Sequence, residues 1–415
     1  MRTLYNIGIF LYWLGLQVAS PFYGKARKLA RGQRGALRKL EAAMALRNGR
    51  QVVWMHCASL GEFEQGRPIL EQLRRERPNT FILLSFFSPS GYEVRKSYAG
   101  VDYVCYLPLD LRRNARRFVH IAAPSIAIFV KYELWYNYLQ TLHQQGVKTY
   151  VVSAIFREQQ AFFDRAYGNF FVQMLRWCEH IFVQNRESLR LLAEVDVHNA
   201  SLAGDTRFDR VLEVATNANT LPELSGFAAS SEYTLVAGST WPADEALLAE
   251  LVNNTPDLKL IIAPHEVSES RVRSLIALFK RPALRYSQWR HSKPTELASY
   301  QIFVVDAIGF LSSLYRFGHA AYVGGGFGVG IHNTLEAAVF GIPVFFGPNY
   351  QRFGEACDLV QVGGAFCVQS TSDLVRTVGI LRTNPACYQA ACNASRSYVE
   401  QHAGATGRVM RNLKI

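Results

Sequence analysis

Two glutamates stand where apolar segments of the sequence end. Glu62 lies in a short turn after residues 51–58, and Glu133 lies near the carboxyl end of residues 124–135. Both segments predict strands, and carboxylates that follow two strands of one parallel sheet can face the same cleft. A carboxylate in such a cleft can act as the general base that takes the proton of a hydroxyl. Taken alone, Glu62 has a simpler interpretation as a first-turn residue that stabilises a helix.

A glycine-rich loop follows the apolar residues 319–323 and leads into a predicted helix over 331–341. Glycines let the backbone approach an anion closely, and a helix start offers unpaired N–H donors. Asn333 and Glu336 share one face of that helix, where a carboxylate can accept hydrogen bonds from ribose hydroxyls. The loop matches neither the dinucleotide nor the P-loop pattern, and taken alone its glycines are also compatible with a mobile turn. Its candidate phosphate-binding glycines are Gly325, Gly326, Gly328 and Gly330.

Two shorter turns end predicted strands in the same half of the chain. One carries Ser239 and Thr240, and the other carries His265, which by itself is more often a surface residue. We expect both turns to face the cleft that holds the glycine loop. The seven cysteines are widely spread without CxxC spacing, which argues against a structural zinc site and against a disulfide framework. No metal and no cofactor are predicted.

The elements that must position these residues are apolar strands alternating with amphipathic helices. This pattern predicts an α/β protein with two Rossmann-like, doubly wound halves facing a cleft. The ranges follow from the composition along the chain. We expect an N-terminal anchor over 1–24, a first Rossmann-like domain over 25–205, a linker over 206–231, a second Rossmann-like domain over 232–384 and a helical segment over 385–415.

The predicted anchor contains no charged residue from Thr3 to Gly24, and a basic cluster follows it over residues 25–50. An apolar run of this length is close to that of a spanning helix, and the basic flank favours the cytoplasmic side. An interfacial helix and a buried first helix remain alternatives, whereas a signal peptide is disfavoured because the charge follows the apolar run. The net charge is +12, but the sequence contains no zinc-finger, RNA-binding or basic-zipper pattern, so we expect no nucleic-acid partner.

Taken together, these motifs resemble those of the Kdo transferases, glycosyltransferases of the GT-B fold with an N-terminal anchor. The resemblance covers almost the whole chain in the same order. The family typically shows Ser-x-Gly-Glu, Glu-Leu-Trp, Gly-(Asn/Asp)-x-(Lys/Arg)-Phe-Asp, Gly-Ser-Thr, and a glycine loop before His-Asn-x-x-Glu-Ala-Ala. In this sequence the motifs are Ser59–Glu62, Glu133–Trp135, Gly204–Asp209, Gly238–Thr240 and Gly324–Ala338.

The resemblance implies transfer of Kdo (3-deoxy-D-manno-octulosonic acid) from CMP-Kdo to the lipid A precursor, lipid IVA, with inversion and without a cofactor. It implies an enzyme of lipopolysaccharide biosynthesis on the cytoplasmic face of the inner membrane, in contact with membrane lipids. By this resemblance Glu62 is the general base and Glu133 its supporting carboxylate. Ser59, Gly61 and Arg157 are assigned to the acceptor or a phosphate, and the CMP-Kdo site is assigned Ser239, Thr240, His265, Gly325, Gly326, Gly328, Gly330, Asn333 and Glu336.

The chain departs from the family pattern at three places. Pro264-His265-Glu266 stands where the family often has Pro-Arg-His, Arg157 occupies a shifted position, and Lys131 replaces a common acid. The sequence also admits a UDP-sugar transferase or a nucleotide-sugar epimerase of the same fold, which release of CMP or of UDP distinguishes. A membrane-tethered scaffold without activity is a further alternative, and the presence of both glutamates argues against it.

Overall fold

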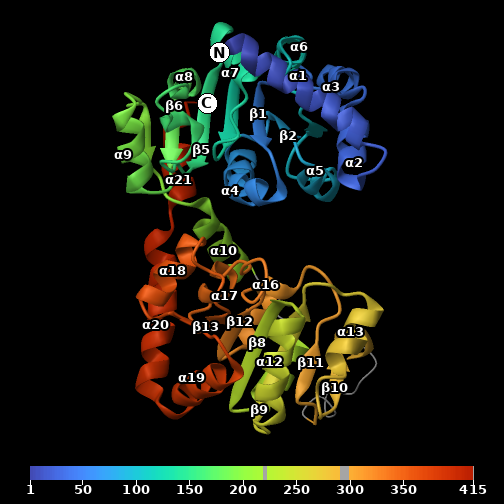
Figure 1. Cartoon of the computed structure of the whole chain (residues 1–415), viewed down its shortest axis with the longest axis vertical. Helices are drawn as coiled ribbons and strands as arrows, with labels where there is room; N and C mark the ends of the chain where they lie inside the picture. Colours follow the sequence, from blue (N-terminus) through green and yellow to red (C-terminus); the bar gives the residue numbers. More distant parts are fainter. Residues whose placement is uncertain (218–221, 290–298, 415) are drawn as a thin grey trace. The chain divides into compact units, whose positions relative to one another are not determined.

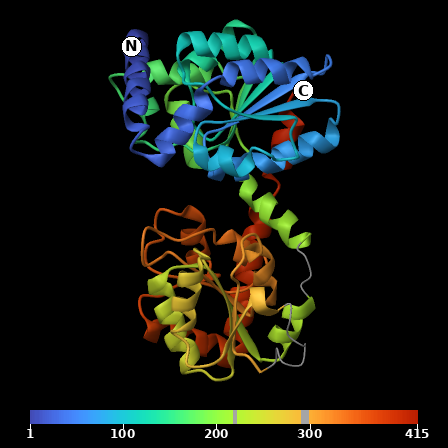
Figure 2. The same ribbon diagram turned by 90° about the vertical axis from the view of Figure 1, so that its right-hand side faces the viewer.

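The structure, a computed structural model, describes residues 1–217, 222–289 and 299–414. Its contacts divide the chain into two compact units (Figures 1 and 2). The first unit comprises Met1–Arg210 and Ala403–Ile415, and the second comprises Val211–His402. Each unit contains one parallel β-sheet with helices packed on it, so the predicted two-sheet α/β architecture is confirmed.

The sheet of the first unit has seven strands in the order β3-β2-β1-β4-β5-β6-β7, and every pairing is parallel. The apolar runs predicted as strands all form strands, because residues such as Val, Ile and Phe suit a sheet that is buried on both faces. β7, of three residues, was not predicted. The strands are β1 (Val52–Cys57), β2 (Phe81–Phe86), β3 (Tyr103–Tyr106), β4 (Ile126–Val130), β5 (Lys148–Ala154), β6 (His180–Val183) and β7 (Ala200–Leu202).

Helices cover both faces of this sheet (Figure 2). Trp54 of β1 is fully buried on one face, where its ring lies 4.8 Å from that of Phe118 and 5.8 Å from that of Tyr138. Met55, the next residue, packs on the other face with Ile69, since successive side chains of a strand alternate. The helices are α4 (Leu60–Glu76), α5 (Pro89–Arg95), α6 (Arg112–Ala122), α7 (Tyr136–Gln144), α8 (Gly168–Arg176), α9 (Arg186–Glu194) and α21 (Ala405–Asn412).

Three helices precede the first strand: α1 (Arg2–Ala19), α2 (Gly24–Gln33) and α3 (Ala36–Ala45). α1 buries Leu16 but leaves most of its large apolar side chains exposed. Among the helices of the described residues, none combines the length and the hydropathy needed to cross a membrane. The N-terminal anchor therefore stays a prediction. The exposed apolar residues of α1 and its N-cap are Met1, Leu4, Ile7, Phe10, Leu11, Tyr12, Trp13, Leu14 and Val18.

The second sheet has seven strands in the order β10-β11-β9-β8-β12-β13-β14, again with parallel pairings. Its strands are β8 (Tyr233–Thr240), β9 (Leu258–Pro264), β10 (Ala283–Arg285), β11 (Ile302–Val304), β12 (Ala320–Val323), β13 (Val344–Phe346) and β14 (Ala365–Cys367). Of these, β10 was not predicted. The longer helices of this unit are α12 (Pro242–Asn253), α13 (Glu269–Ile276), α18 (Gly354–Gln361), α19 (Thr371–Thr383) and α20 (Pro385–His402).

The segment predicted as a linker over 206–231 forms two helices, α10 (Thr206–Thr216) and α11 (Pro222–Ala229), while its residues 218–221 lie outside the described residues. The predicted helical segment 385–415 is divided between the units. α20 belongs to the second unit and α21 to the first, and Gly404, with φ +91°, lies between them. The carboxylate of Asp209 accepts bonds from the backbone N–H and the hydroxyl of Thr406, both at 2.6 Å. Asp209 therefore caps the first turn of α21.

The helix predicted over 331–341 is shorter than expected. Only α17 (Leu335–Ala338) is helical, and the prediction that the helix starts directly after the glycine loop was wrong. The side-chain Oδ1 of Asn333 accepts the N–H of Leu335 at 3.1 Å, which competes with an earlier helical turn. Gly341, with φ +65°, and Pro343 then prevent its continuation.

Candidate active site

Glu62 and Glu133 follow two strands that are neighbours in the first sheet. β1 pairs directly with β4, and β2 lies on the other side of β1. The strand order therefore reverses between β1 and β4, which is the position where open α/β sheets bind their ligands. The two glutamates come from opposite sides of this reversal point, as the sequence predicted for residues at the ends of different strands.

Glu62 lies in the first turn of α4, whose N-cap is Ser59. Its side chain is 6% exposed, and its Oε2 accepts a hydrogen bond from the backbone N–H of Ala58. Burial, followed by the negative charge of Glu133, raises the pKa of Glu62 to about 7, against the opposing effects of that hydrogen bond and of Lys131. A carboxylate with such a pKa changes its protonation state near neutral pH, as a general base must.

Glu133 lies in the irregular segment between β4 and α7, where it is partly buried. Burial raises its pKa, and the positive charge of Lys131 opposes the rise. Lys131 has φ +64°, and its N–H donates to the carbonyl of Val152 at 2.8 Å. One ammonium group thus stabilises the ionised forms of both glutamates, a role that the sequence analysis did not assign to Lys131. Its position two residues before Glu133 was the available signal.

The remaining candidates of the first unit are placed differently from one another. Ser59 and Gly61 lie in the turn that holds Glu62, and Gly61 is exposed. Arg157 follows β5, its side chain is exposed, and its backbone N–H donates to Oε1 of Gln160 at 3.0 Å. Among the described residues no hydrogen bond or ion pair joins Arg157 to the two glutamates. The structure therefore brings Ser59 and Gly61 to Glu62 but does not bring Arg157 to it.

The second unit repeats this arrangement at its own reversal point. β8 pairs with β12, so the turn with Ser239 and the glycine loop follow neighbouring strands. The two turns approach each other closely, because a Cβ on Gly324 would lie 2.4 Å from the carbonyl oxygen of Ser239. A Cβ on Gly326 would lie 2.5 Å from the backbone nitrogen of Gly347. Glycine is required at both positions by this backbone contact.

A buried carboxylate that was not predicted from the sequence holds the glycine loop. Asp244 has no exposed surface and accepts three hydrogen bonds of 2.9 Å, from the N–H groups of Gly325 and Trp241 and from the hydroxyl of Tyr322. Charged acceptors of backbone N–H groups form strong hydrogen bonds. Asp244 thereby fixes the loop to the start of α12 and to β12.

Thr240 is turned inward rather than toward a ligand. It is 1% exposed, and its hydroxyl donates to Oε1 of Glu245 at 3.1 Å. Glu245 is itself buried and ion-paired with Arg271. Thr240 therefore supports the turn, whereas Ser239, with φ +54°, is partly exposed beside it.

Three aromatic rings stack next to the loop. The ring of His265 lies 4.5 Å from that of Trp241 and 4.8 Å from that of His332, with both pairs nearly parallel. The indole N–H of Trp241 donates to Nε2 of His332 at 3.3 Å, so His332 carries its proton on Nδ1. Burial, followed by the neighbouring His265, lowers the pKa of His332, which favours the neutral imidazole. His265 is exposed and offers the stack to a ligand.

Asn333 and Glu336 are brought together, since Nδ2 of Asn333 donates to Oε1 of Glu336 at 3.0 Å. They do not share a helical face as predicted, because Asn333 precedes α17. Beside the loop, Gly330 has φ +129°, and a Cβ there would lie 2.4 Å from a guanidinium nitrogen of Arg352. The sequence analysis did not select Arg352, because it lies outside every motif. Gly328 contributes its carbonyl, which accepts from Nδ2 of Asn349 at 2.7 Å. In the described part of the chain no group of three His, Cys, Asp or Glu side chains is arranged to hold a metal ion.

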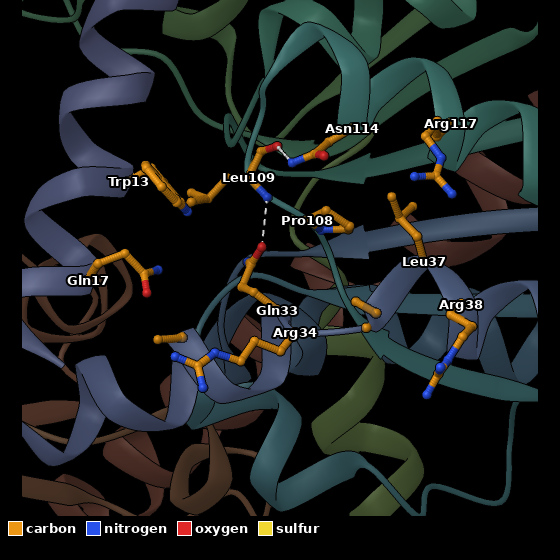
Figure 3. Close-up of a pocket in the computed structure, with 13 residues that line it drawn as sticks. Trp13, Gln17, Gln33, Arg34, Leu37, Arg38, Pro108, Leu109, Asn114 and Arg117 are labelled. Atoms are coloured by element: carbon orange, nitrogen blue, oxygen red, sulfur yellow. Dashed lines mark hydrogen bonds between the residues drawn. The ribbon is translucent and has the colours of Figure 1, made fainter. Parts of the chain in front are cut away.

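The first unit also has a hollow of about 450 Å³ among α1, α2, α3 and α6 (Figure 3). Gln33 builds one wall, since its amide donates to the carbonyl of Leu107 at 2.8 Å and accepts from the N–H of Leu109 at 2.9 Å. Trp13 of α1 also lines the hollow (Figure 3). Three exposed guanidinium groups surround the hollow, those of Arg34, Arg38 and Arg117.

Comparison with known proteins identifies the relatives of this chain. Residues 30–210 match the family model described as 3-deoxy-D-manno-octulosonic-acid transferase (kdotransferase). The 3-deoxy-D-manno-octulosonic acid transferase of Chlamydophila psittaci is 24% identical, and the match covers 88% of this chain and 84% of that protein. The corresponding protein from Haemophilus influenzae is 25% identical, with coverages of 88% and 87%. That from Aquifex aeolicus is 27% identical, with coverages of 80% and 86%. The resemblance to the Kdo transferases is confirmed, and with it the prediction of a glycosyltransferase.

Solved structures show the same fold at low sequence identity. The UDP-GlcNAc 2-epimerase from Neisseria meningitidis has a TM-score of 0.62 and 12% identity, and the match covers 88% of this chain and 99% of that chain. The corresponding enzyme from Methanocaldococcus jannaschii has a TM-score of 0.55 and 12% identity, with coverages of 87% and 99%. These neighbours support the GT-B-like arrangement of the fold.

The raised pKa of Glu62 predicts a pH-dependent loss of stability. The unfolded carboxyl ionises near pH 4.5 and the folded one near pH 7, so between these values the folded state binds more protons and stability falls as the pH rises. Ionising Glu62 in the folded unit costs on the order of 3 kcal/mol. As the pH rises from 5 to 8, we expect the urea concentration at the unfolding midpoint to decrease in the wild type relative to Glu62→Gln.

The matched control is Glu76→Gln, which removes an exposed charge from the far end of the same helix. Its midpoint should follow the wild type across this pH range. Parallel pH curves for the wild type and Glu62→Gln would show that Glu62 titrates as an ordinary exposed carboxyl.

Proposed function

We propose that this chain, a glycosyltransferase by its sequence relationships, transfers Kdo from CMP-Kdo to a hydroxyl of lipid IVA, with inversion and with Glu62 as the general base. The observation that carries the proposal is the pair formed by the buried Glu62 and the partly buried Glu133 at the reversal point of the first sheet. A base with a pKa of about 7 is ionised in a large fraction of molecules at neutral pH and still holds a proton well.

Within this proposal, Glu133 and Lys131 tune the base. The negative charge of Glu133 increases the proton affinity of Glu62, and the ammonium group of Lys131 keeps enough of Glu62 ionised to accept a proton. The N–H of Ala58 holds one oxygen of Glu62 and so fixes the direction of its carboxylate. The acceptor hydroxyl gives its proton to Glu62 as its oxygen attacks the anomeric carbon of Kdo.

The second unit binds the donor in this proposal. Glu336, oriented by Nδ2 of Asn333, accepts hydrogen bonds from the ribose hydroxyls. The glycine loop and Ser239 surround the phosphate, and Arg352 supplies the positive charge that the family places elsewhere. CMP leaves when the bond between the anomeric carbon and the phosphate oxygen breaks, and preorganised N–H and guanidinium groups stabilise its charge. His265 offers a flat ring to the nucleotide.

We also propose that α1 attaches the enzyme to the inner membrane on its cytoplasmic face. The support is the exposed apolar surface of α1 and the guanidinium groups around the neighbouring hollow (Figure 3). Apolar side chains enter the lipid boundary, and arginines bind the anionic headgroups beside them. This arrangement keeps the enzyme at the surface where its lipid acceptor resides.

A nucleotide-sugar epimerase is the second candidate, because solved structures of UDP-GlcNAc 2-epimerases share the fold. Incubation with CMP-Kdo and lipid IVA, and separately with UDP-GlcNAc, distinguishes the two. Release of CMP with a Kdo-containing lipid supports the transferase, whereas conversion of UDP-GlcNAc supports the epimerase.

The first prediction concerns catalysis. Glu62→Gln keeps the size of the side chain but cannot accept a proton, so the single-turnover rate should fall by about 10²–10⁴-fold while CMP-Kdo still binds. Glu133→Gln should be impaired less, through the pKa of Glu62. Glu64→Gln, on the same helix and paired with Arg95, is the control and should turn over normally. A near-normal rate in Glu62→Gln would remove the base from the mechanism.

A second prediction concerns the donor. Glu336→Ala removes the carboxylate assigned to the ribose, and loss of hydrogen bonds to a charged group costs about 1.5–3 kcal/mol. We expect calorimetry to show affinity for CMP reduced by roughly 10–100-fold. Glu250→Ala, which removes an exposed glutamate near the end of α12, is the control. Equal affinities in the wild type and Glu336→Ala would exclude Glu336 from the nucleotide site.

A third prediction concerns the membrane. Replacing Arg34, Arg38 and Arg117 by Gln should weaken binding to vesicles of phosphatidylethanolamine and phosphatidylglycerol by roughly 100-fold, at about 1 kcal/mol for each charge. The control removes the same number of charges at the carboxyl end of α4 and on α9, with Arg75, Arg77 and Arg186 replaced by Gln. Equal losses in the two triple variants would show that only net charge matters.

A further inference from the structure

Asp110 is a buried carboxylate shared by α1 and the start of α7. It is 1% exposed and accepts the hydroxyl of Tyr5 at 2.7 Å on Oδ2. The same oxygen accepts the N–H of Asn137 at 3.0 Å, and Oδ1 accepts the N–H of Tyr138 at 3.1 Å. Asp110 therefore satisfies two of the N–H groups that the first turn of α7 leaves without helical partners.

Tyr5 of α1 binds both Asp110 and the start of α7. Its hydroxyl oxygen accepts the N–H of Tyr136 at 3.3 Å, and its O–H donates a hydrogen bond to Asp110. Its ring lies 5.6 Å from that of Tyr136 and 5.8 Å from that of Phe170. Three consecutive N–H groups at the start of α7 are thus held by one side chain from α1 and one from the loop before α6.

α1 reaches the same segment at a second point. The ring of Tyr12 lies 6.2 Å from that of Phe87, and Phe87 lies 4.8 Å from Trp135, the residue just before α7. Asn6 adds a hydrogen bond, since its Oδ1 accepts Nδ2 of Asn137 at 2.9 Å. The exposed helix that we propose for membrane attachment therefore also packs on the beginning of α7.

The beginning of α7 determines where Glu133 lies. Residues 131–135 have no regular structure and connect β4 to α7. Their backbone is held at one end by the N–H of Lys131 on Val152. At the other end the next residues are those bound by Tyr5 and Asp110. Between these ends Tyr132, Leu134 and Trp135 pack against the core of the first unit, whereas no hydrogen bond or ion pair among the described residues holds the carboxylate of Glu133. Releasing the α7 end therefore lets Glu133 shift, and small displacements of a catalytic group reduce rates strongly.

We propose that Tyr5, through Asp110, is a positioning residue for Glu133, so that the N-terminal helix is part of the acid–base site as well as an attachment to lipid. This rests on the proposed function in so far as Glu62 and Glu133 perform the chemistry. The hydroxyl of Tyr5 does not touch the reacting atoms. It acts by holding the first turn of α7, which in turn holds the carboxylate that raises the proton affinity of Glu62.

The test compares Tyr5→Phe with Tyr12→Phe in the full-length enzyme. Tyr5→Phe keeps the ring packing and removes the hydroxyl. Tyr12→Phe removes a hydroxyl of the same helix that takes no part in the hydrogen bonds of Asp110 and α7. In Tyr5→Phe we expect amide hydrogen exchange at Tyr136–Tyr138 to rise by about tenfold, the effect of one lost hydrogen bond. We expect the single-turnover rate to fall by a similar factor, with CMP affinity and vesicle binding unchanged. Tyr12→Phe should change neither exchange nor rate.

The pH–rate profile separates positioning from a general loss of structure. If Glu133 moves away from Glu62, the acid limb of the profile shifts to lower pH in Tyr5→Phe, because a repelling charge is lost while Lys131 remains. A reduced rate with an unmoved acid limb, or an unchanged rate, overturns the proposal. If the wild type transfers no Kdo, the proposed function fails, and the exchange measurement alone then decides whether Tyr5 holds α7. Unchanged exchange overturns the proposal in that case also.

Discussion

Two like charges kept close together inside a folded protein favour protonation, because burial and mutual repulsion both act against the ionised forms. Both effects raise the pKa of Glu62, burial raises that of Glu133, and Lys131 opposes the rise in both. The surrounding structure determines how close they stay. β1 and β4 bring the two turns to one edge of the sheet, and the N–H of Ala58 holds Glu62 there. A pair of this kind is useful only if neither carboxylate can move away, so the rigidity of both turns is part of the chemistry.

The second unit meets a different constraint with a similar strategy. Its loop has to present backbone N–H groups to an anion, and such a loop needs a rigid base. Asp244 supplies it by accepting bonds from the loop, from the start of α12 and from β12 at once. In the first unit Asp110 does the same for α1 and α7. In each unit a fully buried carboxylate that takes no part in the proposed reaction orders the turns that do.

The sequence predicted the sheets and their long strands because uninterrupted runs of β-branched and aromatic residues suit strands buried on both faces. The strands β7 and β10 were missed because each has only three residues and one of them is polar, whereas the equally short β11, β13 and β14 lie in apolar runs. The helix after the glycine loop was overestimated, because the competition between Asn333 and the backbone is decided locally by one hydrogen bond. The motif glutamates were found by position. Asp244 binds Tyr322 and Gly325 about 80 residues away, and Asp110 binds Tyr5 105 residues away, and contacts this remote leave no local signal.

The close backbone contacts of the glycine loop limit how this protein can change. Side chains at 324 and 326 would collide with the backbone of Ser239 and of Gly347, and residues 325 and 330 have positive φ values. At Gly328 an added Cβ would meet nothing closer than the carbonyl of Gly325, at 3.7 Å. Directed evolution toward a different sugar nucleotide would therefore find one permissive glycine in this loop, at residue 328. New specificity elsewhere must come from the side chains that surround the loop, such as His265 and Arg352.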